Sequence, residues 1–212
     1  MRRLQVMVGI ASAGLVATSL VLAAPVSARD VINGTGGADD LQGTPFSDTI
    51  RGFGGRDRVN ALAGPDLIFG GSGFDEIGGG RGDDTVRGGT KGDLLGGGQD
   101  ADTVYGGAGR DNTFGGAGSD VIFGGTGGDG IYPGAGADTI HGGLGRDGVL
   151  LVGDGAPDTV TCGPGHDVVW GATSKNTIAA DCEDVHVGYP PCDRDVPQRV
   201  RPPVREAARC NP

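Results

Sequence analysis

Aspartate recurs at a fixed interval through most of this 212-residue chain. Every step is nine residues between Asp39 and Asp147, and the series resumes at Asp158 and Asp167 after a shift of two residues. Carboxylates support two kinds of chemistry: they bind hard cations such as Ca²⁺, and as pairs they hydrolyse glycosidic bonds. A catalytic pair would be a singular feature, whereas these aspartates fall equally on every repeat. Their spacing favours structural metal ligands, and no catalytic residue is predicted.

Other catalytic motifs are weak. The three histidines, His141, His166 and His186, are scattered, and none lies in an H-E-x-x-H motif. The segment Gly125–Gly130 satisfies G-x-G-x-x-G, but it lies inside the nine-residue register with no helix expected after it. Ser72 lacks the second glycine of a nucleophile elbow. We therefore predict that the chain is not an enzyme.

Each aspartate belongs to a nine-residue unit whose other positions are also fixed. An aliphatic residue stands two positions after each Asp, with Thr113 as the exception, and glycines precede each Asp, as in Gly115–Asp120. We expect each unit to form a six-residue turn and a three-residue strand, because glycine permits the positive φ that a tight turn needs. Two units per coil turn would give two parallel sheets around a thin core.

The unit G-G-x-G-x-D-x-U-x, in which U is aliphatic, resembles the haemolysin-type calcium-binding (RTX) nonapeptide across residues 34–179. The resemblance implies an all-β fold, a right-handed parallel β-roll or β-helix solenoid with two nine-residue repeats per coil turn. It also implies several Ca²⁺ ions between successive coil turns, held by Asp carboxylates and turn carbonyls. One site would join a loop to the loop two units later, so that Asp111 shares an ion with Asp129.

The loops that best keep their glycines lie between about residues 70 and 150. The ligands predicted from the resemblance are Asp75, Asp84, Asp93, Asp102, Asp111, Asp120, Asp129, Asp138, Asp147, Gly106, Gly109, Gly115, Gly118, Gly124 and Gly127. Lys91 and Asp100 replace glycine; Lys91 would repel an ion, and Asp100 would add a ligand or make the turn bulge. Loops 43–48 and 61–66 have lost most glycines, so we expect coil without full calcium sites there, as in an end cap.

The first 28 residues are typical of a secretory signal peptide. Arg2 and Arg3 precede an uncharged apolar run over 6–24, and the small residues of 26–28 suit cleavage. The alternative is a membrane anchor, since the run is marginally long enough to span a bilayer. The small residues favour cleavage, and no later apolar segment is long enough to cross a membrane. We expect a secreted, extracellular protein.

The remaining chain divides into a predicted roll over 29–187 and a Pro- and Arg-rich tail over 188–212. Removal of residues 1–28 takes away two Arg and no acid, so the net charge becomes more negative than the −10 of the whole chain. That balance argues against nucleic acid as a partner. The tail is either an irregular stapled segment or a basic contact for an acidic polymer.

All four cysteines lie in the last quarter, and an even number in an exported chain suggests two disulfides. Stacked positions in successive coil turns lie ~4.8 Å apart, which is near the Cα separation that a disulfide requires. One coil turn is 18 residues, so Ala180 should stack on Cys162, and Cys182 lies close to that position. Cys162 and Cys182 are therefore the preferred pair. Cys192 and Cys210 would then close the tail into a loop.

Two classes of function follow. The first is a secreted calcium-binding repeat protein that folds on binding Ca²⁺ and has a structural or adhesive role, with an extracellular polymer or cell-surface molecule as partner. The second is a secreted β-helix enzyme or carbohydrate-active module that acts on extracellular polysaccharide. The second expects a singular aromatic cluster, and the one Trp and three Tyr are widely spaced, which favours the first. Without calcium, repulsion between stacked aspartates and the ordering entropy of a glycine-rich chain predict a largely disordered protein.

Overall fold

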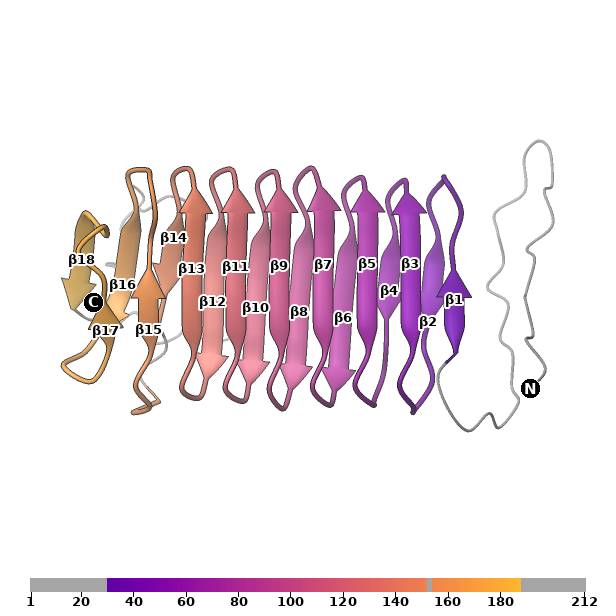
Figure 1. Cartoon of the computed structure of the whole chain (residues 1–212), viewed down its shortest axis with the longest axis horizontal. Helices are drawn as coiled ribbons and strands as arrows, with labels where there is room; N and C mark the ends of the chain where they lie inside the picture. The colour runs from indigo at the N-terminus through magenta and orange to yellow at the C-terminus, as the bar shows by residue number, and fades with distance from the viewer. Residues whose placement is uncertain (1–29, 152–153, 188–212) are drawn as a thin grey trace, which may run out of the picture.

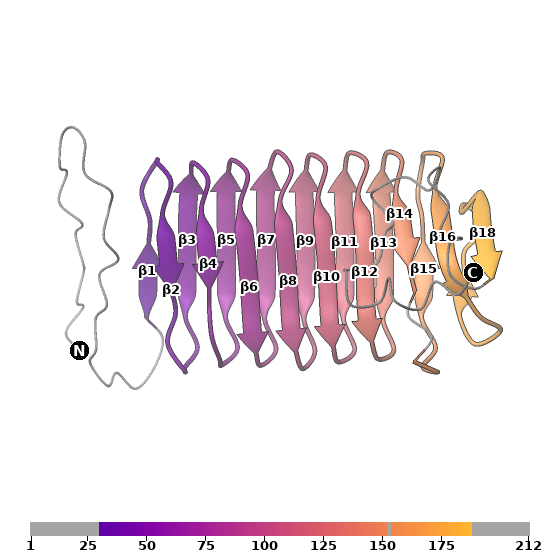
Figure 2. The same ribbon diagram turned by 180° about the vertical axis from the view of Figure 1, so that it is seen from behind.

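The computed structural model describes residues 30–151 and 154–187, which form a parallel β-solenoid without helices (Figure 1). Its strands alternate along the chain between two nine-stranded sheets, one of odd-numbered and one of even-numbered strands. Figure 2 shows the even-numbered sheet from its own side. Each strand pairs with the strand two places later, so two strands make one coil turn and the stack has about nine turns. The predicted all-β parallel solenoid is confirmed.

The strands are short and regular. The odd-numbered sheet contains β1 (Val31–Asn33), β3 (Thr49–Gly54), β5 (Leu67–Ser72), β7 (Thr85–Thr90), β9 (Thr103–Ala108), β11 (Val121–Thr126), β13 (Thr139–Leu144), β15 (Thr159–Thr161) and β17 (Thr177–Ile178). The even-numbered sheet contains β2 (Asp40–Gln42), β4 (Arg58–Asn60), β6 (Glu76–Arg81), β8 (Leu94–Gln99), β10 (Asn112–Ala117), β12 (Gly130–Ala135), β14 (Gly148–Leu150), β16 (Val168–Ala172) and β18 (Asp184–Val187).

The register follows the nine-residue repeat. Ile50 pairs with Ile68, 18 residues later, and the same step continues through the middle of the stack. Two extra residues follow β14, so the two strand pairs that span them have a step of 20 residues, as between Ile140 and Val160, and the next pair, Val160 and Ile178, returns to 18. This is the two-residue slip that the aspartate spacing predicts.

The strands are longer than predicted. Six residues, and not three, form each strand from β5 to β13, and the turn between β5 and β6 is only the three residues 73–75. The glycine pairs continue the parallel ladder, as Gly116 opposite Gly134 demonstrates. The expected six-residue turn is wrong because the backbone of these glycines still pairs with the neighbouring coil turn.

The core consists of two rows of side chains, one row from each sheet, with one inward residue from each strand. From Ile50 to Val169 these residues are at most 4 % exposed and all except Thr113 are aliphatic, so the predicted inward register is confirmed. Ile32, Leu41 and Ile178 are only partly buried, because an end of the stack has a neighbour on one side alone. The core is therefore thin over its whole length and offers little apolar burial per residue.

Thr113 is the one polar residue in these two rows of inward side chains between Ile50 and Val169. It is fully buried between Leu95 and Ile131, and its Oγ1 has no hydrogen-bond partner. A buried hydroxyl without a partner costs roughly 1–3 kcal/mol. We expect Thr113→Val to raise the free energy of unfolding by about 1 kcal/mol in urea titrations. The reciprocal change, Val104→Thr, should lower it; an unchanged or lower stability of Thr113→Val would show that the hydroxyl is satisfied.

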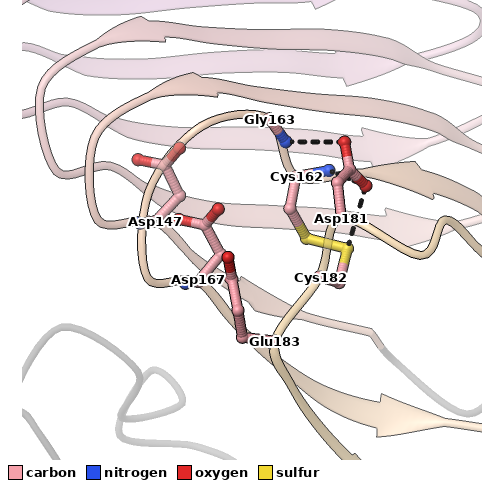
Figure 3. Close-up of a disulfide and its surroundings, with 7 residues drawn as sticks. All are labelled: Asp147, Cys162, Gly163, Asp167, Asp181, Cys182 and Glu183. Carbon is pink, nitrogen blue, oxygen red and sulfur yellow. Dashed lines mark hydrogen bonds between the residues drawn. A yellow bond between two sulfur atoms is a disulfide. The ribbon is translucent and has the colours of Figure 1, made fainter.

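The last coil turns are linked by the disulfide Cys162–Cys182, with 5.1 Å between the two Cα atoms (Figure 3). The predicted pairing is confirmed. Asp181, next to it, accepts a hydrogen bond at 3.0 Å from the backbone N–H of Gly163 through Oδ2. The bridge and this bond fasten the end of the stack to the preceding turn. The predictions for residues 1–28, for the tail 188–212 and for the pair Cys192 and Cys210 lie outside the described residues.

Candidate metal sites

The aspartates of the repeat form two ladders, one along each edge of the roll where the chain passes from one sheet to the other. From Asp48 to Asp167 each of these side chains is at most 3 % exposed. One oxygen, Oδ1, accepts a hydrogen bond from the backbone N–H of the aspartate one turn earlier, as from Asp111 to Asp129 at 2.9 Å. Each carboxylate is thereby fixed in position by the neighbouring turn.

The second carboxylate oxygen, Oδ2, indicates that these aspartates bind a cation. In twelve of these aspartates Oδ2 is buried and has no hydrogen-bond partner. The twelve are Asp57, Asp66, Asp75, Asp84, Asp93, Asp102, Asp111, Asp120, Asp129, Asp138, Asp147 and Asp167. A buried carboxylate oxygen without a partner is strongly unfavourable, so it requires a proton or a cation. All nine aspartates predicted as ligands are in this set.

Asp57, Asp66 and Asp167 are in the set although they were not predicted as ligands. The glycine count excluded loop 61–66, yet Leu62 adopts the positive φ of the turn (79°) without glycine. Phe53 does the same (73°) in the loop before Asp57. The signal that finds these aspartates is their place in the nine-residue series, which Asp167 rejoins after the two-residue slip, and the number of glycines is the less informative criterion.

The first glycine of each loop leaves space for converging oxygens. An ideal Cβ on Gly70 would lie 2.6 Å from Asp75 Oδ2 and 2.7 Å from the carbonyl oxygen of Gly88, one turn further on. Gly106, Gly115 and Gly124 face their own aspartate and the next turn's carbonyl in the same way. A side chain would fill this space, so glycine keeps a carboxylate and a carbonyl oxygen beside each other. Oxygen ligands of these two kinds suit Ca²⁺.

The fourth position of the loop requires a left-handed backbone. Gly109, Gly118 and Gly127 have φ of 144°, 141° and 137°. An added Cβ at each would collide with a carbonyl group of the preceding turn. The predicted glycines therefore shape the turn, and any ligand that they supply is a backbone carbonyl.

Lys91 and Asp100 occupy this same position with φ of 75° and 76°. The turn at Asp100 does not bulge, because β8 and β10 remain in register. Asp100 Oδ2 accepts a hydrogen bond from the backbone N–H of Gly82 at 3.0 Å, and Asp83 Oδ1 accepts one from Ala101 at 3.1 Å. Asp100 thus uses one oxygen to brace the neighbouring turn, and both substitutions preserve the path of the chain.

Side chains alone do not complete a metal site. Within residues 30–151 and 154–187, no three His, Cys, Asp or Glu side chains come together as a ligand cluster. A bound Ca²⁺, which takes 6–8 oxygens, would draw most of them from turn carbonyls. The buried, partnerless Oδ2 atoms and the adjacent carbonyl oxygens fit this requirement, and they repeat along both edges.

Burial raises the pKa of the ladder carboxylates. Loss of hydration is the largest cause, and repulsion from carboxylates one turn away adds to it for Asp84, Asp93, Asp102 and Asp147, whose pKa rises to about 7. The pKa of Asp66, Asp111, Asp129 and Asp138 rises to about 6. The backbone N–H bond to Oδ1 lowers each pKa and only partly offsets the burial. Protons therefore compete with a cation near neutral pH.

Protein donors bond Oδ2 at the N-terminal end of the array. Asp39 Oδ2 accepts hydrogen bonds from the backbone N–H (2.6 Å) and Oγ1 (3.0 Å) of Thr35. Asp48 Oδ2 accepts the same two bonds, at the same lengths, from Thr44. Loop 43–48 therefore satisfies its own carboxylate, in agreement with the expected end cap.

The C-terminal end is closed by another pair of donors. Asn176 Nδ2 donates to Asp158 Oδ2 at 2.8 Å, and Lys175 Nζ donates to the carbonyl oxygen of Gly155 at 2.6 Å. An amide group thus occupies the position where the repeat otherwise has a carboxylate, and an ammonium group bonds a turn carbonyl beside it. On this edge the partnerless oxygens stop where side-chain donors begin, at Asp48 and at Asp158, whereas the other edge has a donor only at Asp39 and its partnerless oxygens continue to Asp167.

Asn176→Asp should make the C-terminal end dependent on calcium, because it removes the donor to Asp158 Oδ2 and adds a second carboxylate. We expect its melting temperature to lie below that of the wild type at limiting calcium and to recover with saturating calcium, with one more ion counted by native mass spectrometry. Asn60→Asp, which adds the same charge at an exposed position, is the control. Equal calcium counts in wild type and Asn176→Asp would contradict the assignment of an amide cap.

The fold and these sites define a class: a parallel β-roll whose turns present buried oxygens to hard cations. The RTX calcium-binding nonapeptide repeat model matches four segments, residues 33–68, 61–95, 78–113 and 114–149. Together they span more than half of the chain, and the chain belongs to this family. Calcium is the ion that this membership implies. No curated protein matches the chain.

Proposed function

We propose that this protein is a secreted, calcium-dependent structural or binding module that folds as its turns bind Ca²⁺ outside the cell. The observation that carries the proposal is the set of twelve buried Oδ2 atoms without protein partners. Bound calcium would supply positive charge beside these oxygens. The chain's own residues do the rest: backbone N–H groups fix each Oδ1, and glycines keep the carbonyl oxygens close to Oδ2.

Coupling of folding to calcium follows from the thin core. One aliphatic side chain per strand stabilises the fold little, while the glycine-rich chain loses much conformational entropy on folding. Burial of charged carboxylates adds a further cost in the absence of a cation. Calcium binding would offset these costs, so the chain remains unfolded where calcium is scarce and folds where it is abundant. No helix of the described residues is long and apolar enough to cross a membrane.

Three observations support an extracellular, non-catalytic role. The disulfide Cys162–Cys182 suits an oxidising compartment. The histidines have structural neighbours: His141 stacks on Phe123, and His186 stacks on Trp170. The buried carboxylates repeat along the roll, and the described residues single out no pair for an enzyme's site, so we favour the structural or binding role over a polysaccharide-degrading one.

Circular dichroism during a calcium titration at neutral pH tests this function. We expect a weak β signal in calcium-depleted buffer and a cooperative increase at ~10⁻⁴–10⁻³ M Ca²⁺, the range of extracellular calcium modules. Mg²⁺ at the same concentrations should have little effect, because it demands octahedral geometry and retains its water. A full β signal in calcium-depleted buffer would contradict the proposal.

A further inference from the structure

The outer surface of the roll is electrically two-sided. We define the basic face as the outer surface of the odd-numbered sheet together with the loops that follow its strands, which lie toward the viewer and along the top in Figure 1. Its charged side chains are Arg51, Arg56, Arg87, Lys91, Arg110 and Arg146. All of these are exposed except Arg51, which is partly exposed.

Between residues 49 and 147 the basic face has no acidic side chain outside the buried aspartate ladder. The exposed and half-buried acids of the repeats lie instead on the even-numbered sheet and the loops that follow it: Asp40, Glu76, Asp83, Asp100 and Asp154. Arg58, on that opposite side, is paired with Glu76 at 3.0 Å. The cations of the basic face have no such partner among the ion pairs of the described residues.

A continuous row of side chains orders two of these cations, Arg51 and Arg87. Phe69 lies between two guanidinium groups, 5.5 Å from Arg51 and 6.0 Å from Arg87. Arg87 also lies 4.5 Å from the ring of Tyr105. The row continues as stacked rings, with 4.9 Å between Tyr105 and Phe123. Cation–π contact orders the arginine side chains, so they lose less entropy when they bind an anion.

The spacing of the cations indicates the kind of anion. Arg51 and Arg87 are two coil turns apart, as are Arg110 and Arg146, which is ~9.6 Å at the usual strand spacing, and only Lys91 and Arg110 follow neighbouring strands. Nucleic acid presents a phosphate every ~3.4 Å per strand, so its charges are much denser than these cations. The spacing suits an extended polymer with sparse negative charges. The rings of Tyr105, Phe123 and His141 stack on one another, and guanidinium groups contact the ring of Phe69, so the row presents few open aromatic faces.

We propose that the basic face binds a linear acidic polysaccharide that carries a single carboxylate or sulfate in each disaccharide. The inference deepens the proposed function and rests on it, because it names the partner of the calcium-loaded module. Calcium would neutralise the aspartate ladder whose members directly follow Arg56, Arg110 and Arg146 in the same loops. Without calcium these carboxylates would repel an acidic polymer, so we expect binding to require calcium.

The test is fluorescence anisotropy of a labelled hyaluronan oligosaccharide titrated with the full chain in saturating calcium. Arg51→Gln with Arg87→Gln should weaken binding about tenfold, since each exposed ion pair contributes up to about one factor of five. The matched control is Arg58→Gln with Arg81→Gln, which removes the same charge from the opposite side and should change the dissociation constant less than twofold. A neutral dextran oligosaccharide should not bind.

Three results would overturn the proposal. Equal weakening of hyaluronan binding by both pairs of substitutions would show that the polymer is attracted by charge in general and not by the basic face. Tighter binding of duplex DNA than of hyaluronan at equal salt would assign the face to another polymer. Failure of hyaluronan to bind, with self-association that Arg51→Gln and Arg87→Gln abolish in sedimentation experiments, would assign the face to a second copy. Circular dichroism separates these failures from failure of the proposed function, because calcium-induced folding is measured independently of the glycan.

Discussion

Asp120→Ala should lower the free energy of unfolding of the calcium-saturated protein by about 4 kcal/mol. Asp120 lies in the middle of its ladder, where Oδ1 accepts the backbone N–H of Asp102 at 2.9 Å and Oδ2 has no protein partner. Alanine would leave a buried N–H without an acceptor, which costs roughly 1–3 kcal/mol. Loss of one ion that is bound at 100 times its dissociation constant would add about 2.7 kcal/mol.

The control for this substitution is Asp39→Ala. Asp39 is at the N-terminal end of the other ladder, and Thr35 already satisfies its Oδ2. Its replacement should cost no more than about 1 kcal/mol, the usual value of a partly exposed hydrogen bond. Urea unfolding in saturating calcium measures both changes. Similar losses for Asp120→Ala and Asp39→Ala would show that the central carboxylates bind no ion.

Acid should stabilise the calcium-free protein, which is the reverse of ordinary acid denaturation. The pKa of Asp84, Asp93, Asp102 and Asp147 is raised to about 7 in the folded state, chiefly by burial, and an unfolded chain has aspartates near ~3.9. A carboxyl group whose pKa is higher in the folded state favours folding when it is protonated. That contribution is full below about pH 4 and is lost as the pH rises to about 7.

Circular dichroism between pH 7.5 and pH 4.5 measures this effect. The β signal of calcium-depleted protein, which is weak at neutral pH, should increase with acidification across that range. In calcium-saturated protein, the control, acidification should lower the melting temperature, because protons displace the ion from the same carboxylates. A β signal that does not increase with acidification in calcium-depleted buffer would contradict the raised pKa values.

The sequence alone predicts the repeating architecture well, because every coil turn repeats the same pattern of glycine, aspartate and aliphatic residues. The aliphatic register from Ile50 to Val169, the slip after β14 and the disulfide Cys162–Cys182 are all confirmed. These features depend on the period alone, and the period is visible in the chain. Strand length was underestimated because backbone pairing of glycines leaves no hydrophobic signal.

What could not be predicted depends on contacts between turns. The side chains of Thr35 and Asn176 cap the ladders because each donates a hydrogen bond to a carboxylate. Those contacts form only in the folded coil, so the sequence does not reveal them. The basic face is likewise invisible in the chain, since Arg51 and Arg87 are 36 residues apart and become neighbours of one ring through coiling. The twelve partnerless oxygens could be identified only in the folded structure, because the position of an aspartate in the sequence does not reveal which of its oxygens is already bonded.

Anomalous diffraction from crystals grown in calcium tests the central claim most directly. Calcium peaks should lie inside the turns beside Oδ2 of the central aspartates, such as Asp111 and Asp129, with carbonyl oxygens completing the coordination. No peak should lie beside Oδ2 of Asp39, Asp48 or Asp158, where protein donors already bond this oxygen. Turns without calcium, in which the central Oδ2 atoms bond only water or protein, would contradict the account.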